Sequence, residues 1–297
     1  MTLNIVCLGE AMAEISSDQS GFRVGFAGDT LNTAIYLQRA LGGAGQVQYL
    51  TRVGQDPLSK GLIDFAANEG IGTEGITCDP ERQVGIYSIA VDDAGERSFH
   101  YWRNQSAARQ MFTSDAEQAA MDAADVIYLS GISIAILSPE GRDRLLATLD
   151  RLRAAGRRVA FDSNYRPRLW EDAATARATM SAFWARADIA LPSVDDEQAL
   201  FGDASDAAVI ARLTDTGVGT GALKRGADGP LPIGAAMPGA TYLRAERIVD
   251  STAAGDSFNG AFLAEYLISG DLGLAMLRGH DMARRVVGVR GAILPRD

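Results

Sequence analysis

Residues 250–258 read DSTAAGDSF, a run in which small residues separate two aspartates, Asp250 and Asp256. The apolar residues just before it, 248–250, predict a buried strand, and the pattern after it predicts a helix that begins near Asp256 and ends at Gly270. The free N–H groups of such a first helical turn form an anion hole suited to a phosphoryl group in transfer. A carboxylate there can accept a proton from an attacking hydroxyl. Its reference pKa near 3.9 makes it a weak base, which suits late proton transfer in a loose transition state. For a bare Gly-Asp pair, the plain alternative is a helix-capping aspartate after a turn.

Outward from this stretch, short apolar runs alternate with amphipathic segments. The alternation predicts a mostly parallel sheet with helices on both faces, within one α/β domain over residues 1–297. The further predicted strands are residues 5–8, 47–50, 126–130, 159–162 and 189–192, and the further predicted helices follow Asp29 (ending at 42–43) and begin at Pro139 (ending at Gly156).

One segment departs from this rhythm. Residues 85–91 and 96–103 are two strand-like runs joined by Asp-Asp-Ala-Gly, which predicts an antiparallel hairpin. Together with part of residues 10–27, the hairpin is expected to form a small β-sheet lid beside the main sheet.

Composition excludes several classes of function. The 297-residue chain has 28 basic and 38 acidic residues, a formal charge of −10, so nucleic acid and anionic membrane surfaces are not expected partners. Two distant cysteines, Cys7 and Cys78, do not make a secreted disulfide scaffold, and residues 1–15 do not resemble a signal peptide. The longest apolar run, residues 126–137, is too short to span a bilayer. We therefore expect a cytoplasmic globular enzyme.

Two further motifs gather side chains suited to an anionic ligand. Residues 101–103 read YWR, and on a strand Tyr101 and Arg103 share one face, which Tyr87 on the partner strand can join. Residues 162–170 read DSNYRPRLW, with Arg166 just beyond a strand end, where ligand crevices of α/β proteins open. Two arginines in one cleft call for an anion, and a planar guanidinium matches a carboxylate. Taken singly, each arginine is more often a solvated surface group.

DSTAAGDSF resembles the C-terminal signature of the PfkB (ribokinase-like) family of sugar kinases. GDTLNT at 28–33 resembles the N-terminal substrate motif GGDTLNT of one branch of that family, with Ala27 in place of the first glycine. Within the family, the chain is most similar to members that phosphorylate 2-keto-3-deoxygluconate. The resemblance implies a ribokinase-like fold, ATP and Mg²⁺ with a possible monovalent cation, and a homodimer or higher homo-oligomer. It also implies a product, 2-keto-3-deoxy-6-phosphogluconate, formed on the terminal hydroxyl.

The same resemblance implies a role for each matching residue. Asp256 corresponds to the catalytic base, and Ala253, Ala254 and Gly255 to the anion hole. The implied substrate-binding residues are Gly28, Asp29, Thr30, Leu31, Asn32, Tyr87, Tyr101, Trp102, Arg103, Arg166 and Asp256. The implied nucleotide-binding residues are Asn164, Arg166, Lys224, Gly226, Asp228, Gly229 and Gly255. Glu197 corresponds to a glutamate that acts on Mg²⁺ through water, although Val194 replaces the asparagine of that motif.

A departure follows the nucleotide turn at 224–229. Pro230 and Pro232 stand where the family usually continues as a strand, and proline cannot donate to a ladder, so this strand should be an edge or broken. Weaker ATP binding is one consequence.

Other chemistries find little support. Residues 131–135 loosely resemble a nucleophile elbow, with Asp162 and His280 in hydrolase order, but the second glycine is missing. There is no zinc motif around His100 or His280 and no P-loop. Two alternatives to the sugar-acid kinase stay open: a kinase for a neutral ketose such as fructose, and a non-catalytic sugar-acid binding protein.

Overall fold

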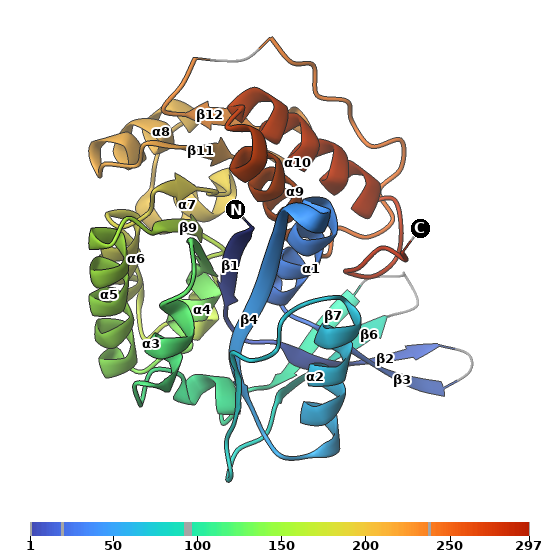
Figure 1. The fold of residues 1–297 in the computed structure, drawn as a ribbon. Coiled ribbons are helices and arrows are strands. Elements are labelled where there is room, and N and C mark those ends of the chain that lie inside the picture. The colour runs from blue at the N-terminus through green and yellow to red at the C-terminus, as the bar shows by residue number, and fades with distance from the viewer. Residues whose placement is uncertain (1, 19–20, 92–96, 237–238, 297) are drawn as a thin grey trace.

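Two β-sheets organise the computed structural model, which describes residues 2–18, 21–91, 97–236 and 239–296 (Figure 1). Within these residues, the larger sheet has eight strands in the order β12-β11-β10-β9-β8-β1-β4-β5. Its neighbours pair in parallel, except that β11 and β12 are antiparallel. The predicted mostly parallel sheet is therefore confirmed.

The strands are β1 (Leu3–Leu8), β2 (Met12–Asp18), β3 (Gly21–Ala27), β4 (Gly45–Val53), β5 (Ile76–Cys78), β6 (Gly85–Val91), β7 (Arg97–Trp102), β8 (Val126–Ser130), β9 (Arg158–Asp162), β10 (Ile189–Ala190), β11 (Thr220–Leu223) and β12 (Leu231–Ile233). The α-helices are α1 (Asp29–Leu41), α2 (Pro57–Asn68), α3 (Ala116–Met121), α4 (Gly131–Ala135), α5 (Pro139–Ala154), α6 (Ala173–Trp184), α7 (Val194–Phe201), α8 (Asp206–Asp215), α9 (Ala254–Ser269) and α10 (Leu272–Val286). Short 3₁₀ turns occupy Gly42–Ala44, Ala107–Gln110, Pro167–Leu169 and Gly226–Asp228.

Helices cover both faces of the larger sheet, because successive strand residues point to opposite sides. On β1, Val6 and Leu8 pack into one buried cluster with side chains of α3 and α5–α8. Ile5 and Cys7 pack into the other with α1, α9 and α10, which lie together in Figure 1. A strand with both faces buried reads as a continuous apolar run, which is why these strands could be found in the sequence.

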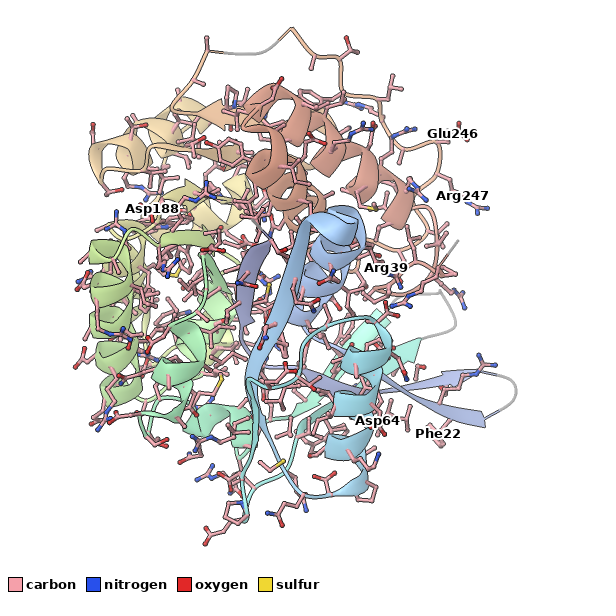
Figure 2. All side chains as sticks on the ribbon, viewed as in Figure 1. Phe22, Arg39, Asp64, Asp188, Glu246 and Arg247 are labelled. Carbon is pink, nitrogen blue, oxygen red and sulfur yellow. The ribbon has the colours of Figure 1, made fainter. Side chains whose placement is uncertain are left out.

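The smaller sheet has the order β3-β2-β6-β7 among the described residues, and it confirms the predicted hairpin and its partner strands. The predicted turn at 92–95 lies outside the described residues. Phe22, which is 84% exposed, sits near the outer end of the β2–β3 hairpin (Figure 2).

The strand predicted at 248–250 is wrong. Ile248 is 70% exposed, and the backbone N–H groups of Val249 and Asp250 donate to the carbonyl oxygen of Val287 at 2.7 and 3.2 Å. The segment is therefore fastened to the end of α10 and pairs with no strand of the described chain. By contrast, β12 is an edge strand containing Pro232, as predicted.

The last described residues run back over the molecule and bind two distant segments. Gly291 N–H donates to Asp250 Oδ2 at 2.8 Å, and Tyr36 of α1 donates to the carbonyl of Ala292 at 2.9 Å. Arg39 Nη1, also on α1, donates to the carbonyl of Leu294 at 2.7 Å. The tail thus ties α1 to the turn that precedes α9. Among the described residues, no helix has the length and apolar character needed to cross a bilayer.

Candidate active site

A cavity of about 570 Å³ opens between the two sheets, at the carboxyl ends of the larger sheet's strands. This edge is where α/β sheets bind ligands. The cavity is lined by Glu10, Met12, Ala27, Gly28, Asp29, Asn32, Tyr87, Phe99, Tyr101, Arg103, Ile132, Asp162, Asn164, Arg166, Ser193, Asp195, Asp196, Lys224, Ser251, Thr252, Ala253, Ala254, Gly255 and Asp256.

The start of α9 forms one wall of this cavity. Ala253 is the N-cap, with φ 60° and ψ 16° in the left-handed region, and its side chain offers no capping bond. The helix begins at Ala254, two residues earlier than predicted. The first N–H groups of a helix have no acceptor within it. Ala254 N–H donates to the carbonyl oxygen of Ser251 at 3.2 Å, while the N–H groups that follow and the partial positive charge of the helix end are suited to an anion in the cavity.

Asp256, in the first turn of α9, is buried beside other polar groups. Its Oδ2 accepts a hydrogen bond from Asn32 Nδ2 at 2.8 Å. Burial raises the pKa of Asp256 to about 8, with Asp29 and Asp162 adding to the rise while Asn32 and Lys224 oppose it. The expectation of an ordinary, weakly basic carboxylate is therefore wrong for the ligand-free protein. The carboxyl is a stronger base than its sequence suggested, and it holds its proton to higher pH.

Asp29, at the start of α1, is fixed by two partners from other elements. Ser130 Oγ donates to Asp29 Oδ2, and Asn164 Nδ2 donates to the same oxygen at 2.7 Å. Burial raises the pKa of Asp29 as well, against the hydrogen bonds from Ser130 and Asn164. Asn164, which the resemblance assigns to the nucleotide, thus contacts Asp29 of the predicted substrate motif at 28–33. Ser130 was missed, because only its place at the end of β8 hints at the site.

The two predicted anion-binding arginines both line the cavity, but they differ in burial and in ion pairing. Arg103 is buried and ion-paired with Glu10, donating from Nε to Oε2 at 2.8 Å. Arg166 keeps a side chain that is 53% exposed and reaches Asp196 at 3.4 Å. Glu10 was missed in the sequence; its place just after β1, at the carboxyl edge of the sheet, is the signal that could have found it.

Three residues of the substrate set lie outside the cavity. A helix turns about 100° per residue, so Asp29 and Asn32 share a face of α1 while the two residues between them point elsewhere. Thr30 Oγ1 meets Tyr49 OH at 2.9 Å, and Leu31 is buried in the core. Trp102 is 62% exposed on the other face of β7 from Tyr101. Phe99 lines the cavity in its place, as the period of two along a strand would indicate.

A second cavity of about 230 Å³ adjoins the first and shares Ser193, Asp195, Lys224, Ala254 and Gly255 with it. It is also lined by Arg225, Gly226, Pro230, Phe258, His280 and Ala283. Of the nucleotide set, Lys224, Gly226 and Gly255 line this second cavity, while Asn164 and Arg166 line the first.

Three predicted residues are placed elsewhere. Asp228 accepts a hydrogen bond from Arg244 at 2.8 Å on the surface, and the ring of Tyr242 packs against Gly229. Glu197 is buried on α7, where its Oε2 pairs with Arg212 at 2.6 Å. Burial raises the pKa of Glu197 to about 7, although Arg212 opposes the rise. The acidic residues of this segment that do line the cavities are Asp195 and Asp196.

Comparison with known proteins places this geometry among carbohydrate kinases. A family model described as pfkB family carbohydrate kinase matches residues 2–297. A 2-dehydro-3-deoxygluconokinase from Escherichia coli (strain K12) is 40% identical over 306 residues, covering 100% of this chain and 99% of that protein. A relative of the same name from Dickeya dadantii (strain 3937) is 42% identical over 302 residues, covering 99% and 97%. A solved structure of fructokinase with bound ATP from Xylella fastidiosa has a TM-score of 0.82 at 24% identity, covering 98% and 94%, a likeness that shows the shared fold.

Proposed function

The chain belongs to the pfkB family of carbohydrate kinases, and on that premise we propose that it phosphorylates 2-keto-3-deoxy-D-gluconate (2-dehydro-3-deoxygluconate) with ATP. The product is 2-keto-3-deoxy-6-phosphogluconate. The observation that carries the proposal is one cavity in which a buried carboxyl at a helix start faces the same space as two arginines. Relatives that carry the name of this activity are 40% and 42% identical along the whole chain.

The reaction needs one proton acceptor and one anion hole. Asp256 takes the proton from the terminal hydroxyl of the sugar acid as the hydroxyl oxygen attacks the γ-phosphorus in line. The bond from that phosphorus to the β-phosphate oxygen breaks, and its electron pair leaves with ADP. The N–H groups at 253–256 hold the equatorial oxygens, where backbone donors act at no cost of reorganisation.

We assign the phosphate end of the donor nucleotide to the second cavity; the support is that Gly226 and Lys224 lie there next to the start of α9. The fructokinase neighbour that contains ATP shares this fold. Mg²⁺ is usually held by one or two carboxylates, substrate phosphates and water, and Asp195 and Asp196 supply such oxygens beside Lys224. When bound, Mg²⁺ supplies charge that offsets the phosphates. These two residues fit that part better than Glu197, which is already paired with Arg212.

The sugar acid is favoured over a neutral sugar by Arg166, whose half-exposed guanidinium lines the cavity and suits a carboxylate. One observation favours the alternative, a neutral ketose such as fructose: Glu10 already neutralises Arg103. The decisive comparison is kcat/KM for both sugars in wild type and Arg166→Ala, a change at an exposed side chain that should leave the fold intact. Loss confined to the sugar acid supports a carboxylate contact, whereas an equal loss for both sugars overturns it.

Asp256→Asn tests the base. In a coupled assay with ATP and the sugar acid, turnover should fall about 10²–10⁴-fold, while calorimetry should show sugar-acid binding within a few-fold of wild type. Normal turnover in this variant would refute the assignment. The same calorimetry separates the third reading, a non-catalytic binding protein, which predicts tight sugar-acid binding and no ATP binding in wild type.

The remaining features belong to the same proposal. The chain acts as one kinase domain over residues 1–297 in the cytoplasm, as a homodimer or higher homo-oligomer, with a monovalent cation as a possible further requirement. The sheet β3-β2-β6-β7 acts as a lid that excludes water from the cavity and so limits wasteful ATP hydrolysis. Its support is that Tyr87, Phe99 and Tyr101 face the cavity from that sheet.

A further inference from the structure

Lys224 stands at the junction of the two cavities, and it lines both. It follows β11, and its side chain is buried. Its Nζ lies 3.7 Å from the position a Cβ would take on Gly255, in the first turn of α9. A cation at this point lies beside the anion hole and between the proposed sites of the two reactants.

The ammonium of Lys224 is held there by two buried side chains from other elements. Nζ lies 2.9 Å from Asp162 Oδ2 at the end of β9 and donates to Asn259 Oδ1 of α9 at 3.0 Å. Asn259 Nδ2 in turn donates to Asp162 Oδ2 at 2.7 Å and to Tyr128 OH at 3.0 Å. An ammonium has three donors, and within the described residues these two partners leave the third for a ligand.

The composition makes this lysine unusual in the chain. Of its 28 basic residues only two are lysines, Lys60 and Lys224, and the rest are arginines. Lys60 lies on the exposed face of α2, paired with Asp64. A buried ion pair is weak evidence of a role in stability, because the cost of desolvating two charges offsets their attraction. A compact point charge with a free donor, however, suits an oxygen of a phosphoryl group.

We infer that Lys224 contacts the phosphoryl group while it passes from nucleotide to sugar acid, and that Asp162 and Asn259 are positioning residues that aim its ammonium. The inference rests on the proposed function. It goes beyond the nucleotide-binding role that the resemblance implies for Lys224, because it assigns this residue to the transfer step and assigns Asp162 and Asn259 to its positioning. The bonds that form and break are those of the in-line transfer above, and none of them involves Lys224. Its contribution is the attraction of a fixed cation for charge that develops on the moving group.

The test compares three variants by steady-state kinetics with ATP and the sugar acid, each checked for cooperative unfolding. Lys224→Met keeps the length of the side chain without its charge, and we expect kcat to fall about 10²–10³-fold with KM for the sugar acid changed less than about threefold. Asn259→Ala leaves the charge but removes one anchor, and we expect a loss of about tenfold in kcat. Lys60→Met is the matched control and should match wild type.

If Lys224 has only a structural role, Lys224→Met should lower the stability of the protein and leave kcat near that of wild type. If Lys224→Met does not fold because the charge of Asp162 is left uncompensated, the double variant Lys224→Met with Asp162→Asn removes both charges. The double variant is then used in place of the single variant. In either protein, kcat within about threefold of wild type overturns the inference.

A second readout does not depend on turnover. In a Lys60→Arg background Lys224 is the sole lysine, and MgATP should slow its acylation by a small amine-reactive ester, read by mass spectrometry. Unchanged labelling also overturns the contact. A wild type that transfers no phosphoryl group to sugar acids would refute the proposed function itself, and the labelling would still decide the contact.

Discussion

As the proposed catalytic base, Asp256 has to lose its own proton before it can take one from an alcohol. Burial raises its pKa to about 8, and the charged groups that face it are Asp29 from α1, Asp162 from β9 and Lys224 just after β11. Because the free enzyme must deprotonate this group, kcat/KM for the sugar acid should rise with pH from 6 and level off above about 8. A pH profile of kcat/KM measures this directly. A rate constant that is flat from pH 6 to 9 would show that no group near 8 controls the reaction.

Arg103 and Glu10 form a pair whose halves depend on each other. Both side chains are buried, so Arg103→Met leaves an uncompensated carboxylate and should lower the free energy of unfolding by about 3–5 kcal/mol. Adding Glu10→Gln removes that charge and should recover most of the loss. Urea titrations of the single and double variants make the comparison. Equal stability of the single variant and wild type would mean that water reaches the pair freely.

Contacts between distant segments, such as that of Arg103 with Glu10, explain which cavity residues could be predicted from the sequence and which could not. Asp29, Asn32 and Asp256 stand in local motifs whose spacing indicates a helix start, so their placement in the cavity could be predicted. Glu10 lines the cavity and Ser130 donates to Asp29 because β1 and β8 end beside each other, a neighbourhood that no local pattern encodes. The substrate motif at 28–33 also includes a residue that does not line the cavity, because Leu31 is buried in the core.

At the scale of elements, the first turn of α9 combines strain with function. Ala253 takes a left-handed conformation, which costs an L-residue about 1–2 kcal/mol. Ala253→Gly should therefore leave stability unchanged or raise it by up to about 1 kcal/mol, with activity preserved. Ala253→Val should lower the melting temperature by several degrees and reduce kcat, because a branched side chain at this φ crowds the cavity. Thermal unfolding and steady-state kinetics of both variants test this, and a valine variant as stable as wild type would contradict it.

Elements with a strong period were predictable, and the exceptions have physical causes. β1, β8 and β9 are largely buried on both faces and read as apolar runs. Residues 248–250 look the same in the sequence, yet their N–H groups find Val287 on α10 instead of a neighbouring strand. Apolar character alone cannot tell a strand from an extended segment held by a helix end. β12 was predictable for the opposite reason, since Pro232 restricts a strand to an edge.

At the scale of the whole molecule, the two sheets differ in how much core they possess. The larger sheet lies between two extensive clusters of buried side chains, whereas the buried hydrophobic residues of the small cluster beneath the other sheet are Met12, Ala27, Tyr87 and Ala292 in the described chain. Local stability follows buried contacts. We expect amide hydrogens of β6 and β7 to exchange faster than those of β1 and β8, and to be slowed when the sugar acid and an ATP analogue bind together.

Hydrogen exchange followed by mass spectrometry resolves these segments. Protection of β6 and β7 should need the ligands and should be absent with an unrelated neutral solute at the same concentration. Uniformly slow exchange in both sheets of the free protein would contradict a lid of low local stability.

The tail beyond α10 has a practical consequence for anyone who produces this protein. Gly291, Ala292 and Leu294 bind Asp250 and α1, so we expect an affinity tag fused after residue 297 to disturb the contacts that hold the turn before α9. Thr2, ahead of β1, is exposed. A removable tag at that end leaves the contacts of residues 291–294 unchanged. Comparing kcat of preparations tagged at opposite ends shows whether a tag has altered the measured activity.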